Sequence, residues 1–245
     1  MQSPVSIDPF LSIIIPAHNE ESRLSKTLDE ILQFSNTRAF RTEIIVVENA
    51  SVDRTLEIAR EYARTNPSIR VIHEDLPGKG LAVKTGMLAA GGDYRFICDA
   101  DLSMPAGEIS RFLPPALTGV DIGIASREAP GAVRYNEPPL RHFVGRVFNT
   151  LVRIIVLHHL QDTQCGFKCF NRKAAETLFP LQTLHGWTFD VEILAIAQKL
   201  GFKIAEVPIP WYYHGDSKVR VVRDSLKMAR DLFRIRASVH RRKFS

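Results

Sequence analysis

Leu11-Ser-Ile-Ile-Ile15, followed at once by Pro16-Ala-His-Asn-Glu20, is the stretch that decides the fold of this chain. An apolar run of this length is typical of a strand that is buried on both faces. Residues 20–33 then place four apolar side chains on one face of a predicted helix, namely Leu24, Leu28, Ile31 and Leu32. A buried strand followed by an amphipathic helix predicts the first unit of a parallel α/β sheet.

The same unit recurs further along the chain. Apolar runs predict strands at residues 43–47, 69–72 and 94–98, and helical periodicity predicts helices at 53–65 and 81–89. We therefore predict an α/β fold in which helices flank a mainly parallel central sheet. A chain of 245 residues with 45% hydrophobic content suits one such domain, with a nucleotide-binding half over residues 1–125.

Charge is spread unevenly over the chain. The net charge is +5, but residues 217–245 hold ten Lys or Arg and two Asp or Glu, so the first 216 residues carry −3. In this tail, helical spacing places basic residues, Lys227 among them, beside an apolar stripe made of Val219, Val222, Leu226, Ala229 and Phe233. Such a helix fits an anionic membrane surface, and the alternative is a helix packed on the domain with a solvated basic face.

The sequence predicts a soluble or peripheral protein. Its most apolar region, residues 140–157, is interrupted by charged side chains and does not suit a membrane span. The apolar stripe of this region predicts either a core or subunit contact or a helix lying in a membrane interface. Three cysteines (Cys98, Cys165 and Cys169) without zinc spacing predict buried, reduced thiols and a reducing compartment such as the cytoplasm.

Two carboxylates follow the strand expected at residues 94–98, in the order Asp99-Ala100-Asp101. Because residues i and i+2 of a strand face the same way, both carboxylates can converge on one divalent cation. Ligands of open α/β sheets collect at the carboxyl ends of the strands. This segment therefore predicts a site for a metal ion and a diphosphate.

Three other loops lie at strand ends. Pro16 fixes a turn that offers Asn19 and Glu20 to a ligand, although Asn19 could equally cap the next helix. Glu48 and Asp53 suit a base imide or ribose hydroxyls, and the alternative for Asp53 is again a helix cap.

The third loop is Pro77-Gly-Lys-Gly80. Gly78 and Gly80 would let backbone N–H groups approach an anion at a helix amino terminus, and Lys79 adds positive charge. The spacing matches neither a Walker loop nor a dinucleotide fingerprint. A tight turn without a ligand is the alternative.

Taken in order, Ile-Ile-Pro-Ala-His-Asn-Glu, Val-Val-Glu-Asn-Ala-Ser-Val-Asp, Gly-Lys-Gly and Asp-Ala-Asp-Leu-Ser resemble the donor half of family 2 glycosyltransferases with a GT-A, Rossmann-like fold. Segments at residues 126–127, 141–149, 162–168, 187–192 and 206–218 narrow the resemblance to the polyprenyl-phosphate sugar synthases. Residues 162–168 and 187–192 are closer to dolichyl-phosphate glucose synthases than to mannose enzymes. The resemblance runs from Leu11 to about Lys218.

The resemblance implies roles for donor-side residues. Asp99 would lie near the ribose and metal, Asp101 would ligate Mg²⁺ or Mn²⁺, and Ser103 stands where some relatives have a metal-ligating Gln. Glu48 and Asp53 would serve the base or ribose. The remaining donor contacts would come from the loops described above, through Pro16, Asn19, Glu20, Gly78, Lys79 and Ala100.

It also implies roles on the acceptor side. Arg127, Arg141 and Lys218 match cations that hold the phosphates of donor and acceptor. Arg146 could join them, because Gly145 stands where the subfamily often has a Ser. Asp190 would bind sugar hydroxyls or orient the acceptor, unless it only begins a helix.

The implied reaction is an inverting transfer of a hexose, with glucose from UDP-glucose as the leading donor, to dolichyl or undecaprenyl phosphate at the cytosolic membrane face. Residues 126–218 would form the acceptor-binding half and 219–245 a basic amphipathic tail. Alternatives are GDP-mannose as donor, or a saccharide hydroxyl as acceptor. A membrane-protein partner or a homo-oligomer stays open. A nucleic-acid partner is not expected, because no stacking motif or helix-turn-helix pattern accompanies the basic charge.

Overall fold

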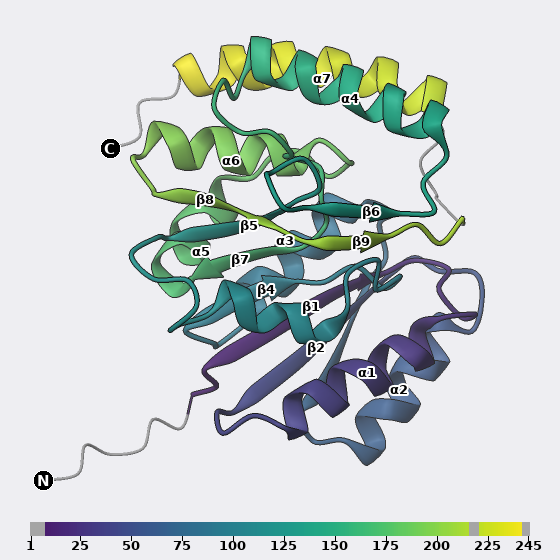
Figure 1. Cartoon of the computed structure of the whole chain (residues 1–245). Coiled ribbons are helices and arrows are strands. Elements are labelled where there is room, and N and C mark those ends of the chain that lie inside the picture. The colour runs from purple at the N-terminus through teal and green to yellow at the C-terminus, as the bar shows by residue number, and fades with distance from the viewer. Residues whose placement is uncertain (1–7, 216–220, 242–245) are drawn as a thin grey trace, which may run out of the picture.

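The computed structural model describes residues 8–215 and 221–241, which form a seven-stranded sheet and a separate two-stranded sheet (Figure 1). The large sheet has the order β3-β2-β1-β4-β7-β5-β8. Its strands are β1 (Leu11–Ala17), β2 (Thr42–Asn49), β3 (Ile69–Glu74), β4 (Tyr94–Ile97), β5 (Ile122–Ser126), β7 (Lys168–Asn171) and β8 (Ile204–Pro208). The small sheet pairs β6 (Val133–Tyr135) with β9 (Pro210–Tyr212).

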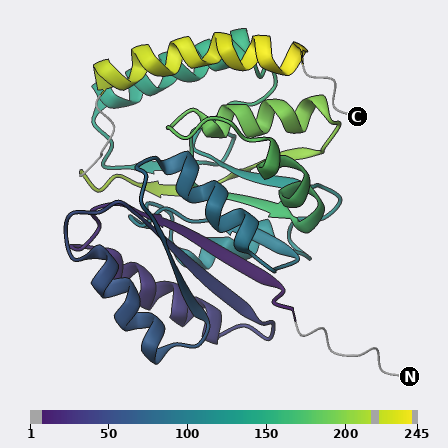
Figure 2. The same ribbon diagram turned by 180° about the vertical axis from the view of Figure 1, so that it is seen from behind.

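Helices cover both faces of the large sheet. They are α1 (Leu24–Asn36), α2 (Thr55–Thr65), α3 (Lys79–Ala89), α4 (Pro139–Ile155), α5 (Arg172–Leu178), α6 (Phe189–Lys199) and α7 (Val221–Arg241), with 3₁₀ turns η1 (Ala106–Phe112) and η2 (Phe179–Leu181). Figures 1 and 2 both show α1 and α2 together at one end of the molecule. At the opposite end α4 and α7 lie side by side and form the outermost layer, over α6.

The mainly parallel sheet is confirmed, with one reversal. Strands β1 to β4 are parallel to one another, whereas β7 runs antiparallel to both of its neighbours, β4 and β5. Strand β1 is central, and its apolar run is fully buried because alternate side chains enter different cores. Ile13 and Ile15 pack with residues of α1, whereas Ile14 packs with residues of α3.

Two predicted features of the helices differ from the structure. Helix α1 begins at Leu24 rather than at residue 20, because Glu20 to Arg23 form a turn in which the Glu20 carbonyl accepts the N–H groups of Arg23 and Leu24. On α7 the predicted apolar stripe is not the packing face, since Phe233 is 63% exposed. The buried apolar residues are Met228, Leu232, Ile235 and Val239. Val219, Val222 and Leu226 fall outside the described side chains.

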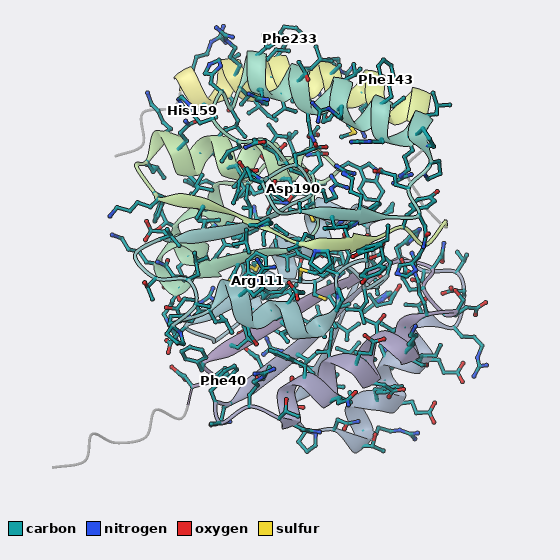
Figure 3. All side chains as sticks on the ribbon, in the orientation of Figure 1. Phe40, Arg111, Phe143, His159, Asp190 and Phe233 are labelled. Carbon is teal, nitrogen blue, oxygen red and sulfur yellow. The ribbon has the colours of Figure 1, made fainter. Side chains whose placement is uncertain are left out.

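The apolar stripe of α4 is not core of this chain. Phe143 and Ile154 are 66% and 64% exposed, and Leu140, Val147 and Leu151 are exposed as well. Figure 3 shows Phe143 and Phe233 together on the outer side of the α4 and α7 layer. Within residues 8–215 and 221–241, no helix is long and apolar enough to cross a membrane. All three cysteines are buried free thiols, as predicted.

Candidate active site

A cavity of about 990 Å³ opens where the loops after β1, β2 and β4 meet, and α4, α7 and the loop before α6 form its other walls. Three non-glycine residues in these loops adopt a left-handed backbone: Asn19 (φ 53°), Ala50 (φ 50°) and Leu102 (φ 44°). Such conformations cost about 1–3 kcal/mol each and cluster at functional sites. The backbone is therefore strained in the loops that follow three neighbouring strands.

Asp99 and Asp101, the predicted metal and diphosphate residues, both line this cavity. The Asp99 carboxylate lies 2.7 Å from the Lys79 ammonium, and Asp101 accepts the backbone N–H of Ser103 at 3.0 Å. Burial alone would lower the pKa of Lys79, but the charges of Asp99 and Asp190 outweigh it and the pKa is raised. Lys79 is therefore a charged ammonium at the floor of the cavity.

Gly166 makes room for Asp99. A Cβ atom on Gly166 would lie 1.8 Å from Asp99 Oδ2, well inside van der Waals contact. The Asp99 carboxylate, which follows β4, thus packs directly against the backbone of Gly166 in the segment before β7. Sequence reasoning quoted this glycine within a motif but gave it no role.

Gly78 and Gly80 have a different task from the predicted one. The N–H of Gly78 donates to Asn49 Oδ1, and the N–H groups of Gly80 and Leu81 donate to the His185 carbonyl. A Cβ on either glycine would lie within 2.7 Å of a backbone oxygen in this loop. The prediction that these N–H groups bind an anion is wrong for this structure, because protein acceptors occupy them, and the Lys79 side chain remains for the anion.

Glu48 and Asp53 lie outside the cavity lining. Glu48 is 1% exposed, accepts the N–H of Ser51 at 2.5 Å and pairs with His73 Nδ1 at 2.5 Å. Asp53 accepts the N–H of Thr55 at the start of α2 and that of Glu21. The helix-start interpretation of Asp53 therefore describes its contacts, and Asn49, next to Glu48, lines the cavity instead.

Asn19 and Glu20 do line the cavity, as does Pro16. The side chain of Asn19 accepts the N–H of Val52, in the loop after β2, at 2.8 Å. Asn19 therefore ties two cavity loops together rather than capping α1. Glu20 pairs with Arg23, which also lines the cavity.

Asp190, which is labelled in Figure 3, lines the cavity from the first turn of α6. It is 5% exposed, and its Oδ1 lies 2.9 Å from the ammonium of Lys168, which is 1% exposed. Burial raises the pKa of Asp190, although Lys168 and Lys79 oppose that shift. Glu192, two residues further along α6, is buried, and its carboxylate accepts the N–H groups of Thr183 and Leu184.

Arg127 reaches the cavity from the end of β5 and is held by Asp162. The guanidinium donates to both carboxylate oxygens, at 2.6 and 2.9 Å, and Asp162 is fully buried. Glu206 in turn accepts the N–H groups of Gln161 and Asp162. The Arg127 guanidinium also lies over the ring of Trp211, 5.3 Å from its centroid.

Replacing Asp162 by asparagine should lower the free energy of unfolding by about 3–5 kcal/mol, because it leaves a buried guanidinium without its charge partner. Burial alone would raise the pKa of Asp162, but Arg127 holds it well below its ordinary value. A depressed carboxyl pKa stabilises the fold above the unfolded-state value of about 3.9, and that stability is lost as the pH falls below it. Urea unfolding at neutral and acid pH measures both effects, and an equal acid sensitivity in wild type and variant would contradict them.

Of the other cations predicted for the phosphates, one lines the cavity and one does not. Arg141 lines the cavity and lies 5.0 Å from the ring centroid of Tyr213. Arg146 is outside the lining, exposed, and paired with Glu128 at 2.9 Å. Arg134, which sequence reasoning missed, lines the cavity and pairs with Glu128 and Glu137. Lys218 lies outside the described residues.

Most predicted residues thus gather around one cavity. Those that line it are Pro16, Asn19, Glu20, Gly78, Lys79, Asp99, Ala100, Asp101, Ser103, Arg127, Arg141 and Asp190. Lining residues without a predicted role include Asn49, Arg134, Gly166, Trp187 and Lys227. Trp187 belonged to a motif that was recognised, whereas nothing local in the sequence distinguishes Arg134 or Lys227 from surface charges.

Comparisons with known proteins place the chain in a family. Residues 12–179 match the family model described as Glycosyl transferase family 2. The chain is 39% identical to a dolichyl-phosphate beta-glucosyltransferase of Trichomonas vaginalis, over 92% of this chain and 70% of that protein. It is 34% identical to that of Saccharomyces cerevisiae, over 93% and 74% respectively.

Solved structures show a similar fold. A glucosyl-3-phosphoglycerate synthase from Mycobacterium tuberculosis, in complex with Mn²⁺, UDP-glucose and phosphoglyceric acid, superposes with a TM-score of 0.70. The match covers 94% of this chain and 79% of that one at 20% sequence identity. At this sequence identity the similarity shows that the two chains share the α/β fold.

Proposed function

We propose that this chain, which belongs to glycosyl transferase family 2, transfers glucose from UDP-glucose to dolichyl phosphate or a related polyprenyl phosphate. Several relatives that match more than nine tenths of the chain are dolichyl-phosphate beta-glucosyltransferases. A nucleotide sugar and a lipid phosphate are both polyanions, so the site must join a place for a metal–diphosphate to a place for a phosphate monoester.

The observation that carries this proposal is a single cavity with both kinds of group. Asp99 and Asp101 stand at the end of β4, and Arg127 and Arg141 reach the same cavity from β5 and α4. Carboxylates that share a metal ion with a diphosphate suit the donor, and guanidinium groups suit an acceptor phosphate. Neither set would be expected in a cavity for an uncharged ligand.

The carboxylates fit a divalent metal ion of the kind that is bound together with a substrate. Mg²⁺ in such sites takes one or two carboxylates and completes its coordination with phosphate oxygens and water. Among the described residues, no group of three or more His, Cys, Asp or Glu could hold a metal alone. Asp99 and Asp101, with Ser103 as a third oxygen, would therefore hold Mg²⁺ or Mn²⁺ together with the donor diphosphate. When bound, the ion would stabilise the negative charge of the departing nucleoside diphosphate.

The residues of this chain would then position two anions. A phosphate monoester is already anionic near neutral pH, so it can attack the anomeric carbon without a strong general base. Arg127 and Arg141 would offset the repulsion between the substrates, and Lys79 would sit beside the diphosphate. A single displacement inverts the anomeric carbon, so an α-linked donor would give a β-linked lipid phosphate.

The test is transfer by the purified chain. UDP-glucose labelled in the sugar is incubated with Mg²⁺ or Mn²⁺ and dolichyl or undecaprenyl phosphate, with GDP-mannose as the competing donor. Labelled lipid from UDP-glucose supports the proposal. Labelled lipid formed only when GDP-mannose carries the label would mean that GDP-mannose, and not UDP-glucose, is the donor. A folded protein that labels no lipid from either donor would refute it.

Asp190 favours a second candidate, transfer to a saccharide hydroxyl. A hydroxyl acceptor needs a base, and the raised pKa of this buried carboxyl makes it a stronger base than an ordinary aspartate. Product on a saccharide acceptor, with activity that falls as the pH drops through the pKa of one carboxyl, would favour this reaction. A phosphate acceptor predicts no such dependence on Asp190.

We also propose that the chain attaches peripherally to the cytosolic face of a membrane through the outer side of α4. Phe143 and Ile154 are 66% and 64% exposed there, beside exposed Arg153. An apolar stripe flanked by basic residues is the pattern of a helix that lies in an anionic interface.

Changing Phe143 to glutamate should markedly reduce binding of the chain to vesicles that contain an anionic lipid. The substitution removes an exposed apolar contact and adds repulsion, but it fills no cavity and breaks no buried contact. Cosedimentation with vesicles measures it, and exposed Val52→Glu on the loop after β2 is the matched control. Equal losses in both variants would contradict the assignment of this face.

A further inference from the structure

The cations that line the cavity differ in whether a carboxylate neutralises them. In the part of the chain that the structure describes, four of the lining Arg and Lys side chains have a carboxylate within 4.0 Å, namely Arg23, Lys79, Arg127 and Arg134. Arg141 and Lys227 have no such partner among the described residues. The positive charge that remains for an incoming anion therefore comes mainly from these two side chains.

The two side chains come from neighbouring helices. Arg141 lies in the first turns of α4, and Lys227 lies on α7, which packs beside α4 (Figures 1 and 2). One turn beyond Lys227, on the same face of α7, Asp231 is 5% exposed and accepts the hydroxyl of Thr188 at 2.8 Å. This bond fixes α7 against the loop before α6. Asp231 also lies 3.6 Å from Arg234, which offsets its charge.

The face of α4 that lines the cavity leaves free space at one residue and a polar atom without a hydrogen-bond partner at another. Gly145 follows Arg141 by one turn, and a Cβ there would meet nothing within 4 Å. Asn149, one turn further, lines the cavity and is 7% exposed, yet its Oδ1 has no hydrogen-bond partner.

Lys227 is also close to the donor end of the cavity. Its ammonium lies 4.0 Å from the position of a Cβ on Gly186, in the loop before α6. The next residue is Trp187, and the Lys79 ammonium lies over its ring, 5.4 Å from the ring centroid. A phosphate held by Lys227 would therefore border the same loop as the ammonium that pairs with Asp99.

We infer that Lys227 of α7 completes the binding site for the acceptor phosphate, opposite Arg141 of α4. The inference rests on the proposed function and adds a residue that neither the motifs nor the matched family region, which ends at residue 179, assigns. It makes α7 a wall of the active site rather than only a surface helix. The phosphate would lie over Gly145, between one guanidinium and one ammonium, and its lipid chain would pass Val144, Phe148 and Met228.

The test uses the full chain, UDP-glucose and a short, water-soluble prenyl phosphate, so that membrane attachment plays no part. Lys227→Gln should raise the KM for the prenyl phosphate roughly ten- to hundredfold, as expected for a lost bond to a charged group. The KM for UDP-glucose should stay unchanged. Lys227→Arg should restore most of the lost affinity, because it returns the charge at the same place.

The matched control is Arg230→Gln, which removes the same charge from the same helix at an exposed position outside the cavity. An equal rise in KM in this variant would overturn the inference in favour of a general charge effect, and an unchanged KM in Lys227→Gln would overturn it outright.

Calorimetric titration of the prenyl phosphate without a donor separates this inference from the proposed function. If the wild type binds the prenyl phosphate, Lys227→Gln weakens that binding and no glucose is transferred, the phosphate site stands and the proposed donor fails. If the wild type neither binds nor uses the prenyl phosphate, both proposals fail.

Discussion

Replacing Asp101 by asparagine is expected to reduce transfer roughly a thousandfold, because a metal ion at a developing charge supplies several kcal/mol of stabilisation. The amide keeps the size of the side chain and can still accept the N–H of Ser103, which Asp101 accepts at 3.0 Å. The turn after β4 should therefore survive while the charge is lost. Rates measured over a range of Mn²⁺ concentrations, together with thermal melting, test the prediction.

The readout separates a metal ligand from a structural acid. Asp101→Asn should need far more Mn²⁺ for its residual activity, and its melting temperature should stay near that of the wild type. Glu57→Gln is a matched control, because Glu57 is an exposed acid of α2 that pairs with Arg54 on the surface. Full activity of Asp101→Asn at the metal concentration that suffices for the wild type would rule out Asp101 as a ligand.

The first half of the fold was predictable because its signals are local. Strand β1 and the strands that pair with it are apolar runs between polar loops, and helices α1 and α2 carry regular apolar faces. The reversed strand β7 was not predicted, since its place in the sheet depends on pairing with β4 and β5, which lie more than forty positions earlier in the chain. Pairing over such separations leaves no periodic trace in the sequence.

The tail shows that one helix can present two apolar faces, of which only one packs on the domain. Apolar residues at helical spacing lie on two different faces of α7, one that includes Phe233 and one that includes Leu232. Packing against α6 and α4 selects Leu232, which is fully buried, and leaves Phe233 in solvent. Only the tertiary partner decides between such stripes, and the same choice turns Lys227 toward the cavity.

For the site, the sequence predicted the carboxylates but not what holds them. Asp99 and Asp101 follow a strand at a recognisable spacing, and both line the cavity. Their supports are remote: Lys168 beside Asp190, and Gly166 beside Asp99, come from the segment around β7. A buried lysine and a glycine under a carboxylate have no local pattern, because their roles exist only once the sheet has formed.

Gly166→Ala should therefore impair transfer almost as severely as loss of Asp99 itself. The new Cβ would lie 1.8 Å from Asp99 Oδ2 and 2.3 Å from its carboxyl carbon, so the carboxylate must move. That movement would break the 2.7 Å pair between Asp99 and Lys79. It would also move the Asp99 carboxylate away from the place proposed for the metal ion and the donor diphosphate. A misplacement of about 1 Å can cost roughly a hundredfold in rate, and here the shift must exceed that.

A double-mutant cycle distinguishes this mechanism from simple destabilisation. In an Asp99→Ala background the obstructing carboxylate is absent, so adding Gly166→Ala should change the residual rate little. Gly107→Ala serves as the control, because a Cβ on that glycine meets nothing within 4 Å. Since the clash is with a side chain and not with backbone, the Asp99→Ala change should also recover any stability that Gly166→Ala loses. Additive losses of rate in the double variant would mean that Gly166 acts through something other than the position of Asp99.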